Sequence, residues 1–194
     1  MKGAIKVIIP IQGIYDMTEE LKKTYDERDL NKLAKQLGIL VDYFSMGYGQ
    51  TSCKGFFMQA FDVKHISINS DLTLIEQYII FAHEFGHAMQ NQKAVVRYDD
   101  WAILDSTNEM EINANYFAAD WIMADEDVMD LVMSGMTFFQ IAAMLNVLPE
   151  LLAYKYHSMG RRGYEGMNSP VDVRSRYLSE YKPLAKMAED YIDD

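Results

Sequence analysis

The chain has 194 residues, of which 49% are hydrophobic and 24% charged, and its formal net charge at pH 7 is −11. These values are those of a globular domain and exclude a disordered chain. The acidic balance disfavours direct binding to nucleic acid or to an anionic membrane, and it favours a basic protein partner. Because Cys53 is the single cysteine, no intrachain disulfide is possible, and we expect a cytoplasmic protein.

Short elements are predicted in the first 70 residues. The apolar run 4–14 is too short to span a bilayer, and we expect it to form a buried strand or arm. An apolar stripe predicts a helix over 17–37. Three runs rich in β-branched and aromatic residues predict short strands, the last two joined by a turn around Phe61 and Asp62, at 39–45, 55–60 and 64–69.

The strongest helix candidate runs from about 72 to 91. Cap-type residues precede it at 69–71 (Asn-Ser-Asp), and apolar residues at helical spacing occupy more than one of its faces. Such a helix is expected to be central and buried. It carries the segment His83-Glu84-Phe85-Gly86-His87, which matches the pattern H-E-x-x-H.

This pattern predicts a zinc site with a general base beside it. Residues four apart lie on one helix face, so His83 and His87 can bind the same ion. A catalytic zinc typically has three protein ligands and a water, and Glu84 is placed to accept a proton from the attacking water. The alternative is a pair of histidines hydrogen-bonded in a helix core. It is disfavoured because two imidazoles and a carboxylate buried together are costly without a metal or partners.

Two downstream carboxylates are candidates for the third ligand. Glu109 also fits a capping box that begins at Ser106 and would start the next helix. Glu111 has no such role and stands four residues before Asn115, which could orient a metal ligand as a hydrogen-bond partner. The separation of 24 positions from His87 to Glu111 leaves room for the chain to turn and return antiparallel.

Two motifs carry a family resemblance. HEFGH is followed by EINANYFAA at 111–119, with the strand ISIN at 66–69 before the first motif and WIM at 121–123 after the second. Over about residues 25–160 the chain resembles the ImmA/IrrE metallopeptidases, which show H-E-x-G-H and then E-x-x-A-N-x-F-A-A. It departs from them at Ala124, where the family usually has Pro. The resemblance implies a gluzincin-like fold in which His83, His87 and Glu111 bind one zinc per chain and Glu84 is the base. It also implies, as substrates, helix-turn-helix repressors of mobile elements or stress-response genes.

The predicted fold class is α+β and zincin-like: a small mixed sheet, a buried helix with the H-E-x-x-H motif, a returning helix with Glu111, and a helical C-terminal part. We expect a metallopeptidase core over 1–124, a helical subdomain over 125–160, and a loop and helical tail over 161–194. The spacing of 137–159 is similar to a helix-turn-helix. Because Lys155 is the only Lys or Arg in this segment, packing around the site is favoured over DNA binding.

The sequence therefore predicts a cytoplasmic zinc-dependent endopeptidase that cuts a basic DNA-binding repressor, with no direct contact to nucleic acid or membrane. The alternative is a zinc-containing, non-catalytic regulatory or toxin–antitoxin partner protein. A peptidase also needs a hydrogen-bond donor for the developing oxyanion, for which the sequence offers four candidates without choosing among them: His157, Tyr154, Tyr156 and Tyr116.

Overall fold

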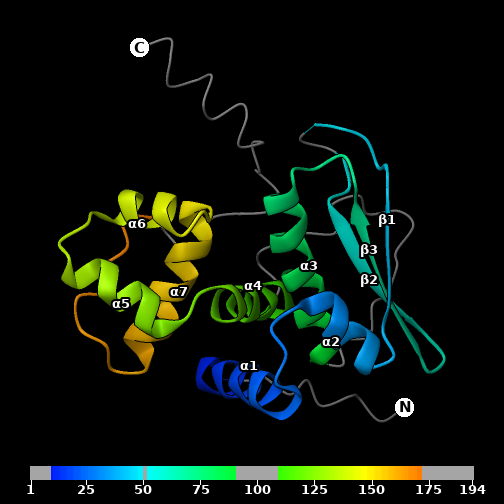
Figure 1. Cartoon of the computed structure of the whole chain (residues 1–194), viewed down its shortest axis with the longest axis horizontal. Helices are drawn as coiled ribbons and strands as arrows, with labels where there is room; N and C mark the ends of the chain where they lie inside the picture. The colour runs from blue at the N-terminus through cyan, green and yellow to red at the C-terminus, as the bar shows by residue number, and fades with distance from the viewer. Residues whose placement is uncertain (1–9, 50–51, 91–108, 172–194) are drawn as a thin grey trace.

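The computed structural model describes residues 10–49, 52–90 and 109–171. Within these residues it confirms the predicted α+β class, with a small sheet at one side of the molecule and helices over the rest (Figure 1). Helix α3 (Leu74–Met89) packs between the sheet and helix α4 (Glu109–Ile122), and helices α1 and α7 contact α4. None of the helices in these residues is long and apolar enough to cross a membrane.

The sheet has three strands in the order β1-β3-β2. Strand β1 (Leu40–Phe44) runs parallel to β3 (Val63–Asn69), and β2 (Gly55–Ala60) runs antiparallel to β3 and forms one edge. All three predicted strands are present, and the turn after β2 places Phe61 at φ 55°. Ile66 and Ile68 of β3 are fully buried in the core beneath α3, which fixes that face of the sheet towards the helix.

The N-terminal helices differ from the prediction. The expected single helix over 17–37 is two helices, α1 (Ile11–Tyr25) and α2 (Leu30–Gln36). The chain breaks at Asp26, which has the left-handed φ of 47° that Asp tolerates better than most residues, and Asp29 then caps α2 through its side chain. The expected strand or arm over 4–14 is also wrong for 11–14, which begin α1, while residues 4–9 lie outside the described chain.

Helix α3 begins with a capping box. Thr73 accepts a hydrogen bond from the Glu76 amide, and the Glu76 carboxylate accepts one of 2.7 Å from the Thr73 amide. The caps expected at 69–71 are therefore wrong. Asn69 is fully buried, and its amide nitrogen donates to the carbonyls of Gly47 and Cys53, so this side chain holds the loop before β2.

Helices α3 and α4 approach closely at Gly86. A Cβ built on Gly86 would lie 3.0 Å from the Phe117 Cβ and 3.2 Å from the Ala114 Cα. Most real contacts to a Cβ are longer than these, so a side chain at this position would push the helices apart. The glycine thus brings the start of α4 within reach of the histidines on α3.

Three helices follow α4: α5 (Asp125–Met133), α6 (Phe138–Met144) and α7 (Pro149–Arg161). The Gln140 side chain accepts a 2.9 Å hydrogen bond from the Thr137 amide at the start of α6. The proposed division at residues 124 and 160 stays a prediction. The expected cap at Ser106 and the tail from 172 onwards lie outside the described residues.

Candidate metal centre

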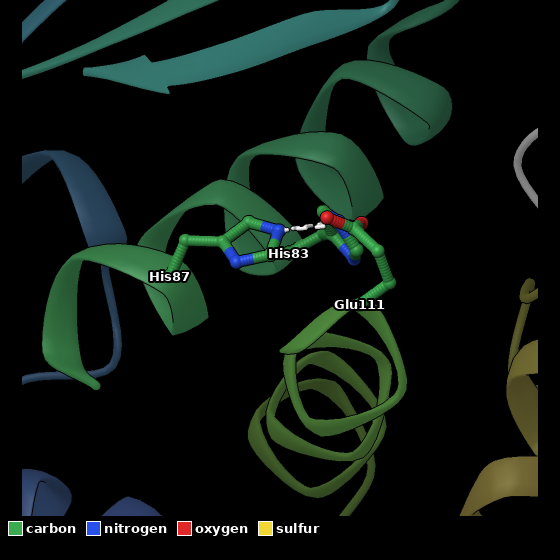
Figure 2. Close-up of side chains that lie close together, drawn as sticks. All are labelled: His83, His87 and Glu111. Carbon is green, nitrogen blue, oxygen red and sulfur yellow. Dashed lines mark hydrogen bonds and ion pairs between the residues drawn. The ribbon is translucent and has the colours of Figure 1, made fainter. Parts of the chain in front are cut away.

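Three side chains from two helices converge on one point (Figure 2). The Nε2 atoms of His83 and His87 are 3.0 Å apart, and one carboxylate oxygen of Glu111 lies 3.1 Å from the first and 3.4 Å from the second. Helix α3 supplies both histidines, which lie one turn apart, and α4 supplies the glutamate from its first turn. Together the three side chains form a group that could hold a metal ion.

These separations match the size of a zinc ion's ligand shell. Zinc–nitrogen and zinc–oxygen bonds of about 2.0–2.2 Å, arranged tetrahedrally, place neighbouring ligand atoms roughly 3.3 Å apart. The observed 3.0, 3.1 and 3.4 Å lie close to that value. The donor set of two imidazoles and one carboxylate is also a known catalytic zinc set that leaves the fourth position open.

The hydrogen bonding of His83 fixes which of its nitrogens faces the site. Its Nδ1 lies 2.9 Å from the side-chain oxygen of Asn115, an acceptor, so Nδ1 carries the proton. In the neutral ring Nε2 is then a bare acceptor aimed at Glu111, which is an acceptor too. A cation between them removes this conflict, and Asn115 holds the imidazole in the tautomer that a metal needs. Asn115 thus contacts His83, and its role in orienting a metal ligand stays a prediction.

Glu111, and not Glu109, reaches the histidines. The Glu111 side chain is only 12% exposed, whereas Glu109, two residues earlier on the same helix, is exposed. Burial opposes ionisation of Glu111, but the proximity of His83 and His87 outweighs it and keeps the pKa of this carboxyl below its ordinary value. The carboxylate is thus ionised at neutral pH, which is the form that binds metal.

Glu84 lies beside this group but is not one of its three members. It is buried, and burial raises the pKa of its carboxyl above the ordinary value, against the opposing influence of the two histidines. A backbone hydrogen bond from Phe57 on the edge strand β2 also reaches this carboxylate. A carboxyl with a raised pKa can both accept and release a proton, as a general acid–base requires.

The candidate oxyanion donors lie together on α4 and α7, with one exception. Tyr116 Oη and His157 Nδ1 are 2.5 Å apart and hydrogen-bonded, and the Tyr154 ring packs edge-on against that of Tyr116. Tyr156 instead packs against Phe138 of α6. The role of an oxyanion donor stays a prediction for each of them. The remaining histidine, His65, pairs with Asp42 at 2.9 Å on the sheet.

A second buried group of charges lies near the other end of α4, and sequence reasoning missed it. Lys155 Nζ lies 2.9 Å from Asp120 and 2.6 Å from Asp125, and both aspartates also contact Arg162. Ser158 donates to Asp120 at 2.8 Å. The sequence signals were present: an aspartate inside the apolar run of α4, and a lone lysine inside the apolar run of α7.

This group decides how the helix-turn-helix spacing of 137–159 should be interpreted. In a DNA-binding unit the second helix exposes a face to the major groove. Here most of α7 is buried, including Lys155, whose side chain is 1% exposed. The structure thus agrees with packing as the role of these helices.

The fold and the site together define a zincin-like class: a mixed sheet, a helix bearing H-E-x-x-H, and a returning helix that brings a glutamate to the histidines. The chain belongs to the M78 peptidase family, whose profile, described as the IrrE N-terminal-like domain, matches residues 34–157. The resemblance found in the sequence is thereby confirmed. A Bacillus phage phi105 protein, "Uncharacterized immunity region protein 2", is 28% identical over 146 residues, which cover 75% of this chain and 90% of that protein.

Proposed function

We propose that this protein is a zinc-dependent endopeptidase and that it cuts a helix-turn-helix repressor of a mobile element or stress response. The observation that carries the proposal is the convergence of His83, His87 and Glu111 with a buried Glu84 beside them. A structural zinc site is usually closed by four protein ligands and does not need a base. Membership of a peptidase family supports the same class of reaction.

The residues have distinct tasks in this proposal. His83, His87 and Glu111 would hold the zinc, which when bound lowers the pKa of water and polarises the scissile carbonyl. Glu84 accepts the proton of the attacking water and later delivers it to the departing amine. Asn115 keeps the ring of His83 oriented, and the backbone of Phe57 keeps the Glu84 carboxylate in place.

The substrate class has two lines of support. The chain carries a net charge of −11, which speeds encounter with a basic protein and slows encounter with acidic ones. The relative's name places it in a phage immunity region, which favours a repressor as the partner. We propose a cytoplasmic enzyme with one zinc per chain.

Glu84→Gln tests the enzyme against the alternative of a non-catalytic zinc-containing partner. The variant should retain zinc, because it loses no metal ligand, and should lower kcat by a factor of about 10²–10⁴, the usual contribution of a general acid–base. The measurement mixes each zinc-loaded protein with any helix-turn-helix repressor that a neighbouring gene encodes and follows fragments over time, with zinc content from elemental analysis. Equal cleavage by both proteins would disprove the assigned base, and no cleavage by either would favour the non-catalytic partner.

A further inference from the structure

Strand β2 supplies a backbone contact to the proposed base. The strand forms one edge of the sheet and packs against α3, the helix that carries Glu84 (Figure 1). Phe57 of β2 is buried, and its backbone N–H donates a hydrogen bond to the Glu84 carboxylate. The base is therefore carried by a helix and held by a strand, so its orientation depends on the distance between the two elements.

The hydrogen-bond ladder shows independently that this N–H points away from β3. Opposite residues of an antiparallel pair alternate between those that exchange backbone hydrogen bonds and those that do not. Continued by one residue before β2, the register places Lys54 opposite Asn69, and the Asn69 amide donates to the Lys54 carbonyl at 2.9 Å. Phe57 lies three residues further along, in a pair that does not exchange such bonds. Its N–H is thus directed out of the sheet edge and is free to reach Glu84.

Gly55 lets β2 lie unusually close to α3. A Cβ built on Gly55 would lie 2.6 Å from the Cγ2 methyl of Ile80 and 2.9 Å from the backbone oxygen of Ser67. Real Cβ atoms essentially never come this near to other atoms. Gly55 is not among the glycines with a positive φ, so its backbone conformation does not require glycine. What requires glycine here is the close approach of the strand to the helix and to β3.

The spacing along the two elements carries this closeness to the base. Ile80 and Glu84 are one helical turn apart on the same face of α3, about 6 Å along its axis. Gly55 and Phe57 are two residues apart on the same face of β2, roughly 7 Å along the strand. Since these lengths nearly match, Gly55 meets Ile80 where Phe57 meets Glu84.

We infer that Gly55 is a positioning residue for the general base: it sets the distance between β2 and α3 at which the Phe57 N–H holds the Glu84 carboxylate. This inference rests on the proposed function, because it takes Glu84 as the base. A base acts over hydrogen-bond distance, and a displacement of about 1 Å can cost roughly 10²-fold in rate. A side chain at position 55 would cause such a displacement without touching a metal ligand.

Amide hydrogen exchange, followed by NMR on the full-length zinc-loaded protein, tests the contact without relying on catalysis. Glu84→Ala removes the acceptor, and Gly55→Ala moves the donor. Each should speed exchange of the Phe57 amide roughly tenfold or more. Gly160→Ala is the matched control, because its Cβ would meet only the Met167 Cβ at 3.6 Å, an ordinary contact, and it should stay within about twofold of the wild type.

Unchanged exchange of the Phe57 amide in Glu84→Ala would overturn the inference, whether or not Gly55→Ala folds. Unchanged exchange in a folded Gly55→Ala protein would overturn it as well.

The second measurement is cleavage of the repressor by the same zinc-loaded proteins. Gly55→Ala should keep its zinc affinity within about twofold and lower kcat roughly 10–100-fold, with a smaller change in KM. Adding Ile80→Leu, which removes the methyl that the new Cβ would meet, should recover part of the kcat. Wild-type kcat in Gly55→Ala would overturn the positioning role. If the wild type cuts no repressor while Gly55→Ala and Glu84→Ala still release the Phe57 amide, the proposed function fails and the contact stands.

Discussion

The two ends of helix α4 both bury charged side chains, and they differ in how those charges are balanced. Near its C-terminal end, Asp120 joins Asp125, Lys155 and Arg162, so two carboxylates face two cations and the group is complete in itself. Near its N-terminal end, Glu111 meets the Nε2 atoms of two imidazoles, which also face each other. A buried group that balances itself supports structure, whereas a buried group that lacks a positive charge implies a ligand.

The largest expected effect comes from removing Glu111, the carboxylate near the N-terminal end of α4. Glu111→Ala should weaken zinc binding by more than about 100-fold, beyond the loss typical of a residue that only orients a ligand. Glu109→Ala should leave zinc affinity unchanged and cost at most about 1 kcal/mol of stability, as a helix-start residue would. Zinc titration with a competing chelator measures the first effect, and urea denaturation measures the second. The opposite result, with zinc lost in Glu109→Ala only, would reverse the assignment.

At the C-terminal end of α4, a substitution should lower the free energy of unfolding and leave zinc binding unchanged. Lys155→Met removes one cation from a buried pair and leaves the carboxylates undercompensated, which costs about 3–5 kcal/mol. The exposed Lys23→Met serves as control and should change stability by less than about 0.5 kcal/mol. Chemical denaturation gives these values, and the folded fraction should still hold one zinc. A cost for Lys155→Met below about 1 kcal/mol would mean that the group does not hold the helices together.

A smaller effect on the metal is expected from the residue that orients His83. Asn115→Ala should weaken zinc binding about 10–100-fold, while Asn115→Asp, which keeps an oxygen acceptor, should retain most of the affinity. Asn113→Ala on the same helix is the matched control. If Asn115→Ala binds zinc as tightly as the wild type, then the 2.9 Å contact with His83 contributes nothing to the site.

The smallest predicted effect is the dependence of stability on pH that arises from Asp125. Burial alone would raise the pKa of Asp125, but hydrogen bonds and charge from Arg162 and Lys155 lower it below its ordinary value of 3.8. A carboxyl whose pKa is lower in the folded chain stabilises the fold above its unfolded pKa, and this contribution disappears as the pH falls further. Stability measured from pH 6 downward should therefore fall below about pH 4, and Asp125→Asn should show a shallower fall. An identical slope for both proteins would contradict the shift.

The meeting of His83 and His87 was predictable because its signals are local. A spacing of four residues on a helix places two histidines together whatever the rest of the fold does. The choice of Glu111 over Glu109 needed the family resemblance as well, since neither spacing nor capping settles it alone. The α+β class followed from runs of strand-forming residues ahead of long apolar helices, and the structure confirms it.

What the sequence did not predict depends on contacts distant along the chain. The break between α1 and α2 rests on one aspartate in a left-handed conformation, and the apolar stripe within the predicted helix 17–37 (Leu30, Leu33, Ala34 and Leu37) lies wholly after it. Thr73 caps α3 because Asn69 is committed to carbonyls of the loop before β2. The pairing of Lys155 with Asp120 spans 35 residues, and helical periodicity carries no information on such pairs.

The close approach at Gly86 has a consequence for searches of sequence collections. Many proteins contain H-E-x-x-H by chance, and the pattern alone does not say whether a third ligand can arrive. In this chain that arrival depends on a small residue at the contact of two helices, Gly86 on one and Ala114 on the other. A query that requires both small residues, with the glutamate three positions before the alanine, therefore selects for helix spacing as well as for ligands. Chains that keep the histidines but place a bulky residue at either position should be counted as a separate class, in which we expect the third ligand to come from elsewhere.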